Sequence, residues 1–364
     1  MQIREIVNYL ESLAPLSSQE GYDNAGLICG NKSTSITNAL ISLDCTEAII
    51  DEAIEKGCNL VISHHPIVFK GLKTFTGKNY VERTIIKAIK NDIAIYAIHT
   101  NLDNYKFGVN YKIGELLKIK QPQILSPSQD NLNKVIVYVP KSHTKIVMES
   151  MFKAGAGQIG NYSECSFLSE GKGSYKPNIN ATPFLGETGK QHQENELKIE
   201  VLVSAHKLSQ VVNSLIANHP YEEVAYDIIP LHNKNQHEGS GMIGELETEM
   251  NTLDFLSQLK QTFNCKVIRH TKIHKSKIKK IAWCGGSGSF LLSDAKRLKA
   301  HIFITGDFKY HEFFDAENQI IIADIGHFES EQFTIDLIGE LLSKKFTKFA
   351  PCLTEINTNP VKYF

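Results

Sequence analysis

The sequence contains no uninterrupted apolar run of membrane-spanning length and no pair of cysteines in a CxxC motif. A transmembrane helix needs about 20 consecutive apolar residues, so the chain is not expected to cross a membrane. Charges also interrupt the N-terminal segment MQIREIVNYLESLAP, which argues against a signal peptide. The seven dispersed cysteines predict reduced thiols in a cytoplasmic protein and give no support to a cysteine-ligated metal site.

A surplus of charge of either sign is also absent. Lys and Arg total 39 and Asp and Glu total 40, which gives a net charge of −1. This balance argues against a general electrostatic attraction to nucleic acid or to anionic membranes. Hydrophobic residues make up 42% and charged residues 22% of the 364 positions, as in an ordinary globular protein. At ~100–200 residues per domain, this length predicts two or three domains.

Short apolar runs alternate with helical patterns in both terminal parts of the chain. Strands are predicted at 39–43, 59–63, 93–98, 278–284, 301–305 and 319–324, and helices at 46–56, 80–90, 253–263, 291–299 and 330–345. Runs that are apolar without alternation predict strands buried on both faces, and hence a largely parallel sheet covered by helices. We therefore expect an α/β fold in which two βα-rich halves, 1–128 and 236–364, form one metal-binding core.

The middle of the chain follows a different pattern. Its predicted elements are a strand at 134–139, a helix at 143–154, a strand at 197–203, a helix at 206–218 and a strand at 224–229. Two βαβ units of this kind predict an inserted ferredoxin-like α+β domain, which we place at 129–235. Residues 171–193, rich in Gly, Pro, Asn and Ser, are predicted to form a long loop or hairpin. The segment LHNKNQHEGSGMIGEL is interpreted as a polar linker back to the core.

Two adjacent histidines follow a predicted buried strand in the segment LVISHHPIVFK. In open α/β sheets, ligands bind at the carboxyl ends of the strands. Pro66 favours an extended backbone at His65, and adjacent side chains in an extended chain point apart. His64 and His65 could therefore serve two neighbouring metal ions, although a plain pair of loop histidines fits the same pattern.

The next predicted strand ends in the same way, in the segment YAIHTNLDN. His99 follows the strand and Asp103 lies in the predicted loop beyond it. A histidine and a carboxylate there suit a metal that takes nitrogen and oxygen ligands. Alternatively, Asp103 caps the next helix.

The segment DIGHFESEQFTIDLIGELL carries the most discriminating pattern. His327 and Glu331 are four residues apart, so they share one face of the predicted helix. An apolar stripe continues that face, and a carboxylate at its start is costly unless it is paired or bound to metal. Glu329 is expected to point elsewhere and to be solvated. The alternative is that Glu331 is favoured only by the helix dipole.

Together the three segments predict a metal centre made from both ends of the chain. Five ligands exceed the usual number for one catalytic metal, which takes about three protein ligands plus water. They suit two divalent ions about 3.5–4 Å apart, with Glu331 as the better bridge. Oxygen and nitrogen ligands without thiolate leave zinc, manganese, iron and cobalt open. The predicted ligands are His64, His65, Asp103, His327 and Glu331.

Two further segments give weaker signals. In IFITGDFKYHEFFDA, Asp307 follows a strand and His311 lies four residues on, so both could support the ligands or move protons. Asp307 could equally cap a helix. The glycine-rich turn in AWCGGSGSFLL could bind an anion through backbone N–H groups, but a tight turn between a strand and a helix fits it as well.

These motifs resemble those of the NIF-three-like family, the GTP cyclohydrolase 1 type 2 homologues. The resemblance rests on GYDNAGLICG, SHHP, HTNLDN, CGGSGS, TGDFKYH and GHFESE, and it covers both halves outside the insert. Tyr22 stands where the family usually has Trp, while Asp23 and Asn24 are intact. The resemblance implies that the same five residues are dinuclear metal ligands. It also implies a toroidal homohexamer with its metal sites facing an interior cavity.

The segment NHPYEEVAYDI at 218–228 is similar to the PII/CutA-like insert of longer bacterial members. The resemblance to GTP cyclohydrolases implies a metal-dependent hydrolase acting on a small-molecule substrate. His99, Asp307 and His311 are then the candidates for proton transfer. The competing hypothesis is a non-enzymatic metal-binding scaffold, such as a metallochaperone or regulatory protein, which would use the same ligands.

Overall fold

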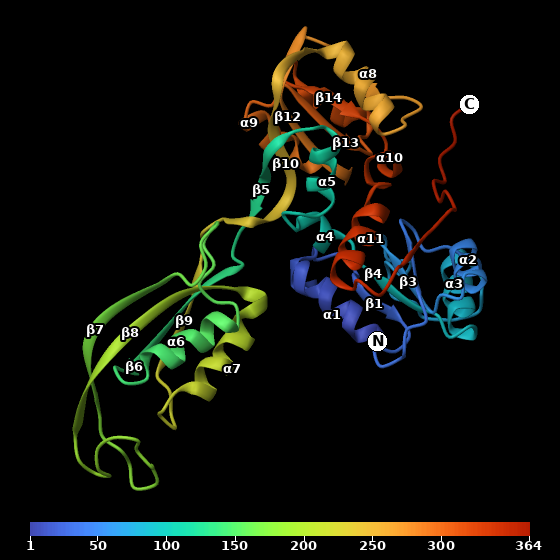
Figure 1. Cartoon of the computed structure of the whole chain (residues 1–364). Coiled ribbons are helices and arrows are strands. Elements are labelled where there is room, and N and C mark those ends of the chain that lie inside the picture. The colour runs from blue at the N-terminus through green and yellow to red at the C-terminus, as the bar shows by residue number, and fades with distance from the viewer. The chain divides into compact units, whose positions relative to one another are not determined.

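The computed structural model describes all 364 residues and divides them into two compact units (Figure 1). One unit combines Met1–Pro127 with His237–Phe364, and the other is Ser128–Gln236. None of the helices combines the length and apolar character needed to span a bilayer.

One sheet of the larger unit has five strands in the order β1-β4-β3-β2-β15, four from the first half of the chain and β15 from its C-terminal end. Its strands are β1 (Gly26–Cys29), β2 (Ala39–Ser42), β3 (Leu60–Ser63), β4 (Ala94–Ala97) and β15 (Cys352–Leu353). They are parallel except for β1, which pairs with β4 in the antiparallel sense. Every residue of β2, β3 and β4 is buried, as the apolar runs predict.

Helices cover both faces of this sheet because successive strand residues point to opposite sides. Leu40, Val61 and Ile95 face α2 (Glu47–Glu55) and α3 (Tyr80–Lys90). Ile41 and Ile62 face the other way, toward α1 (Ile3–Leu13) and α11 (Thr334–Lys345).

The other sheet of the larger unit has six strands in the order β11-β14-β13-β12-β10-β5, with β5 contributed by the first half of the chain. Its strands are β5 (Lys120–Ser128), β10 (Asn235–Asn251), β11 (Arg269–His270), β12 (Lys277–Ser287), β13 (Ile302–Gly306) and β14 (Ile321–Asp324). Strands β12, β13 and β14 are parallel, whereas β10 and β11 run antiparallel to their neighbours. The accompanying helices are α4 (Thr100–Asn104), α5 (Val109–Leu116), α8 (Thr252–Thr262), α9 (Leu292–Arg297) and α10 (His327–Glu331).

The unit Ser128–Gln236 has the element order β-α-β-β-α-β and an antiparallel sheet in the order β7-β8-β6-β9. Its elements are β6 (Leu132–Pro140), α6 (Thr144–Lys153), β7 (Ser166–Tyr175), β8 (His192–Ser204), α7 (Leu208–Asn218) and β9 (Tyr226–Leu231). Alternate residues of β6 and β8, among them Val137 and Val201, pack against α6 and α7. The two helices lie side by side on one face of the sheet (Figure 1).

The interpretation of LHNKNQHEGSGMIGEL as a polar linker is wrong, because most of this segment belongs to the long strand β10. Met242 and Ile243 pack into the cores on opposite faces of the sheet, and β10 pairs along β12. Its glycines and polar residues resemble a loop in sequence, although Gly241, Met242 and Ile243 are buried in succession. The βα-rich halves form two sheets, each parallel at its centre as predicted, with antiparallel strands that the sequence pattern did not predict.

The helix predicted at 330–345 is two helices, α10 and α11. The side-chain amide of Gln332 donates to the backbone oxygens of Glu329, at 3.1 Å, and Phe263, at 2.9 Å. The first bond satisfies a carbonyl at the end of α10, where helical partners run out. The apolar stripe that begins beyond Glu331 therefore lies on a separate helix.

Candidate metal centre

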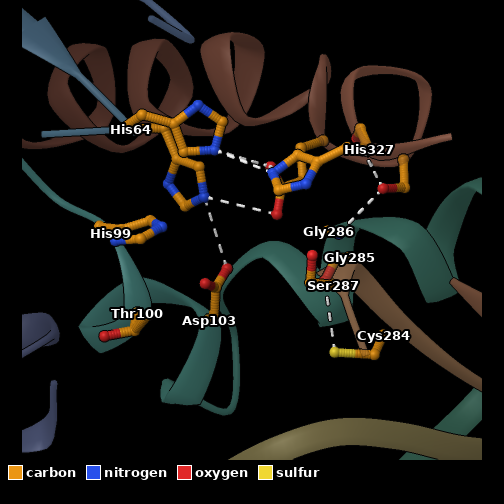
Figure 2. A network of polar contacts seen from close by, with 12 residues as sticks. His64, His99, Thr100, Asp103, Cys284, Gly285, Gly286, Ser287 and His327 are labelled. Carbon is orange, nitrogen blue, oxygen red and sulfur yellow. Dashed lines mark hydrogen bonds and ion pairs between the residues drawn. The ribbon is translucent and has the colours of Figure 1, made fainter. Parts of the chain in front are cut away.

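Four histidines gather where the parallel strands of the two sheets end. His64 and His65 follow β3, His99 follows β4, and His327 begins α10 just beyond β14. Two carboxylates join them from short helices, Asp103 from α4 and Glu331 from α10. Figure 2 shows His64, His327 and Asp103 pointing toward one another, with His99 at the edge of the group.

The carboxylate of Glu331 lies at the centre of this cluster. Its Oε2 is 3.0 Å from Nε2 of both His65 and His327, and its Oε1 is 3.8 Å from Nε2 of His64. Oδ1 of Asp103 approaches the same His64 nitrogen to 3.6 Å. Groups from residues 266 positions apart in the sequence thus meet within hydrogen-bonding distance.

The cluster contains overlapping sets of three ligand atoms that all lie within 4.8 Å of one another. One set is His65, His327 and Glu331, and a second is His64, Asp103 and Glu331. Glu331 is common to both, while the adjacent residues His64 and His65 fall in different sets. A third set joins His99 to the same two histidines.

Two buried polar atoms in this cluster have no hydrogen-bond partner, Nε2 of His64 and Oδ1 of Asp103. An unsatisfied buried polar group costs about 1–3 kcal/mol, so native proteins rarely leave one. A divalent cation between the two atoms would satisfy both. Imidazole and carboxylate donors without thiolate fit such an ion.

Each histidine is also held by a hydrogen bond on its other ring nitrogen, Nδ1. An acceptor at Nδ1 fixes the tautomer and the ring orientation, and leaves Nε2 free to bind a metal. Three of the four acceptors are carboxylates, the partners most often found behind metal-binding histidines. The pairs are His64 with the Ile98 carbonyl at 2.8 Å, His65 with Asp44 at 2.8 Å, His99 with Asp23 at 2.8 Å and His327 with Asp307 at 2.6 Å.

The electrostatics of the cluster centre on the charge of Glu331. Burial opposes that charge, but the neighbouring histidines, His327 first, hold the pKa of Glu331 well below its usual range. Burial alone lowers the pKa of a histidine, as it does for His64. At His65 and His327 the adjacent carboxylates outweigh burial and raise the pKa to about 9 and about 11. Without metal, protons on these two rings therefore balance the buried carboxylate.

Asp103 shows the opposite response to the same environment. Burial and the nearby charge of Glu331 raise the pKa of its carboxyl group well above the usual range. Two carboxylates close together disfavour ionisation of one of them unless a cation lies between. A metal ion would reverse this effect and keep both ionised.

Comparison with known proteins gives the family directly. A family model described as Duf34/NIF3 (NGG1p interacting factor 3) matches residues 1–360. The chain belongs to this family. The resemblance seen in the sequence motifs is thereby confirmed.

The relatives of the chain cover nearly its whole length. It is 40% identical over 324 residues to a Halalkalibacterium halodurans protein named GTP cyclohydrolase 1 type 2 homolog, covering 88% of this chain and 87% of that protein. It is 36% identical to the Staphylococcus epidermidis protein of that name, covering 100% of both chains. The crystal structure of a Bacillus cereus protein related to NIF3 is 36% identical and covers 100% of this chain and 99% of that chain, with a TM-score of 0.86.

The structure excludes the helix-capping alternative for two aspartates of this Duf34/NIF3 chain. Asp103 lies within α4 rather than in a loop, and the helix that follows begins after Gly108, so Asp103 does not cap it. Asp307 caps no helix either. It holds the ring of His327 and accepts a hydrogen bond from the Ser287 hydroxyl at 2.5 Å.

The structure does not bring His311 to the cluster. This residue is exposed on a short 3-10 helix, Tyr310–Ala316, where its ring contacts Tyr310 and stacks on Phe314. This position gives no support to the predicted role of His311 in proton transfer. Asp307 directly follows β13 and contacts His327, whereas His311 lies on the 3-10 helix that comes after it.

The glycine-rich end of β12 is packed against the cluster, and three of its backbone N–H groups are already bonded, which gives no support to an anion site. The backbone N–H groups of Gly285, Gly286 and Gly288 donate to side-chain oxygens of Asn110, Ser330 and Thr305, respectively. A Cβ at Gly286 would lie 2.3 Å from Oε1 of Glu331, and its φ of +61° also favours glycine. The turn thus leaves room for the central carboxylate.

Glu329 was expected to be solvated, but only 7% of it is exposed. Its Oε1 accepts a hydrogen bond at 3.2 Å from the side-chain amide of Asn359, in the C-terminal tail. The helical pattern around Glu329 could not predict this contact, because Asn359 lies 30 residues further along the chain. Glu329 does point away from the ligand sets, as expected, since it belongs to none of them.

Sequence reasoning missed Asp44 and gave Asp23 no role. Asp44 follows β2 at the same edge of the sheet as His65, so the rule that identified the histidines could have identified it too. The C-terminal tail also contributes, because Thr358 donates to Oδ2 of Asp44 at 2.5 Å. A cavity of about 810 Å³ lies over the cluster, and Asp44, His99 and tail residues such as Asn359 line it. This volume suits a small-molecule ligand.

Proposed function

We propose that this Duf34/NIF3 chain binds two divalent metal ions and uses them in hydrolysis. The observation that carries the proposal is the pair of three-residue sets that share Glu331. One ion would take His65, His327 and Glu331, and the other His64, Asp103 and Glu331. Zinc, manganese, iron and cobalt all suit these nitrogen and oxygen ligands.

Divalent ions in such a site supply a Lewis acid and an activated water for attack on an electrophilic carbon or phosphorus atom. The chain supplies the orientation of the ligands. Asp44 and Asp307 hold His65 and His327 with Nε2 toward Glu331. Removing these carboxylates would leave the ligands in place but free to rotate.

The pair His99 and Asp23 is suited to move a proton beside the metal centre. Asp23 accepts from Nδ1 of His99 and from the backbone N–H of Thr100. Burial opposes its charge, but the hydrogen bonds from His99 and Thr100 lower the pKa of Asp23 to about 2. A carboxylate that stays ionised fixes the His99 tautomer, and His99 lines the cavity with its other nitrogen available.

The substrate is proposed from the cavity and from the name that the relatives carry. Tyr22, Phe69 and Phe290 line the cavity and offer stacking surfaces to a planar ring. The relatives are named GTP cyclohydrolase 1 type 2 homologs, so GTP is the first substrate to test.

A non-enzymatic metal-binding role is the second candidate. His64 and Glu331 are 0% and 3% exposed, and a deeply buried ligand set would retain its ions well. A storage or regulatory protein would use the same ligands without an open coordination position.

Three further features belong to the proposal. The βαββαβ order of Ser128–Gln236 and its strand order support an inserted ferredoxin-like domain of the PII/CutA-like type. Seven free cysteines support a reducing compartment such as the cytoplasm. Exposed aromatic residues such as Tyr310 and Phe314 support self-association, and the homohexamer is part of the proposal. Light scattering tests the last point, with six times the 40.8 kDa chain mass expected.

The deciding experiment combines elemental analysis with a hydrolysis assay. The purified protein is stripped with chelator, reloaded separately with zinc, manganese, iron or cobalt, and incubated with GTP and a panel of phosphoesters. Two ions per chain and activity that disappears with chelator and returns with metal would support the hydrolase. Activity untouched by complete metal removal would refute it, and tight metal binding without any hydrolysis would favour the scaffold.

A further inference from the structure

The unit Ser128–Gln236 contains a cavity of its own, of about 640 Å³. Residues 169–175 of β7 line it, together with residues between β7 and Phe184. The other lining residues are Tyr138, Glu196, Lys198, Tyr221–Glu223 and Ala225. Its volume falls in the range of sites that hold small organic ligands. All of its lining residues lie within this unit, so the cavity is independent of the metal centre.

Three aromatic rings form a continuous wall of this cavity. The ring centroids of Tyr175 and Tyr221 are 5.9 Å apart at an interplanar angle of 62°, and those of Phe184 and Tyr221 are 6.3 Å apart at 49°. These inclined planes present ring faces in different directions. The hydroxyl of Tyr175 donates to the backbone oxygen of Leu185 at 3.0 Å, which fixes one ring against the loop.

A buried carboxylate, that of Glu196 on β8, also lines the cavity. Only 7% of Glu196 is exposed, and its single hydrogen bond comes from the Tyr221 hydroxyl at 2.9 Å. The residue forms no ion pair, although a buried carboxylate is costly without one. Space for it comes from Gly173, where a Cβ would lie 2.1 Å from Oε2 of Glu196.

The cationic side chains of the cavity do not neutralise Glu196. Lys198 is bound to Glu200 on the same strand at 2.5 Å, and Lys172 and Lys176 are exposed. Burial and the charge of Glu196 raise the pKa of Tyr221, so this hydroxyl remains a hydrogen-bond donor and supplies no positive charge.

We propose that this cavity is a binding site for a small organic ammonium ion, held by the faces of Tyr175, Phe184 and Tyr221 and by the carboxylate of Glu196. A cation is attracted to the face of an aromatic ring, and more strongly where water is excluded. The ammonium group also gives the buried carboxylate the partner that it lacks. Further carboxylates at Glu222 and Glu223 line the same cavity and attract positive charge.

The decisive comparison uses two ligands of the same shape. Choline and its neutral isostere 3,3-dimethylbutan-1-ol differ in the charge of one central atom. Titration calorimetry of the full chain, repeated with tetramethylammonium and spermidine, should show binding of at least one cation and at least tenfold weaker binding of the isostere. Equal binding of choline and the isostere, or binding of ATP with no cation bound, would overturn the proposal. Absence of binding by all three cations would overturn it as well.

Variants then locate the site. Glu196→Gln should weaken cation binding roughly tenfold to a hundredfold, because the bond to a charged partner is lost. Phe184→Leu keeps apolar bulk at a half-exposed position and should weaken it about threefold to tenfold. Glu149→Gln removes the same charge from α6, outside the cavity, and should leave binding unchanged. Equal affinity in the wild type and both cavity variants, with all proteins folded by circular dichroism, would refute the assignment.

Discussion

The shared carboxylate offers the sharpest test of the metal centre, through Glu331→Gln. Because Glu331 belongs to both three-residue sets, this single substitution leaves each ion with two protein side chains. Loss of a carboxylate that only supports a ligand typically costs 10–100-fold in metal affinity. Loss of a ligand should cost at least as much at each ion, and hence at least about 10²–10⁴-fold for double occupancy. Glutamine keeps the side-chain volume, so the space beside Gly286 remains filled.

Glu329→Gln is the matched control, on the same helix. Glu329 is 7% exposed and Glu331 3%, so both substitutions remove a buried carboxylate from α10. Glu329 contacts Asn359 and lies outside both ligand sets. The control keeps an oxygen that can accept the Asn359 hydrogen bond, and it should keep its metal.

The assay is elemental analysis at a metal concentration that gives the wild type two ions per chain. The Glu331 variant should retain less than one ion, and the Glu329 variant two. In the metal-free Glu331 variant, NMR titration should also show the pKa values of His65 and His327 well below about 9 and about 11, because the carboxylate that raises both is gone. Equal metal content in the two variants would refute the ligand assignment.

Four further outcomes follow from the same geometry. Asp44→Asn should weaken metal binding about 10–100-fold through His65, and unchanged affinity would show that the tautomer is held by other means. Gly286→Ala should displace the central carboxylate and empty the site, whereas full occupancy would contradict the close approach at this turn. Since His65 and His327 are protonated below pKa values of about 9 and about 11, metal binding at pH 7 should release at least about two protons per chain, and the affinity should fall as the pH is lowered. Calorimetry in buffers of different ionisation enthalpy measures this release, and a value of zero contradicts it. Replacing 129–235 with a Gly/Ser linker should leave a folded, metal-binding core, and loss of metal or of soluble protein would show that the core needs the insert.

Local sequence patterns were sufficient to predict strands in which every residue is buried. The apolar runs at β2, β3 and β4 are buried at every position, and α3 begins and ends at the predicted residues, Tyr80 and Lys90. The rule that ligands bind at the carboxyl ends of parallel strands was sufficient to select side chains from distant segments that meet in space. It worked because β3, β4 and β14 each end beside the cluster.

Features that depend on distant contacts were not predictable in this way. Strand β10 is rich in glycine and polar residues, and only its pairing with β12 identifies it as a strand. Glu329 is buried by a tail that has no periodic pattern. The break after Glu331 depends on a side-chain bond from Gln332 to a carbonyl. Such interactions are set by tertiary structure, which overrides local preference.

The separation of the two ligand segments has a consequence during protein synthesis. His65 and Glu331 are 266 residues apart, so the site is incomplete until nearly the whole chain has been made. At about 5–20 residues per second, the first histidines wait for roughly 10–50 s before their carboxylate partner is translated. Ions should therefore be acquired at the end of translation or after release from the ribosome. A chain that terminates between Asp103 and α10 should carry the first three proposed ligands and hold no metal pair.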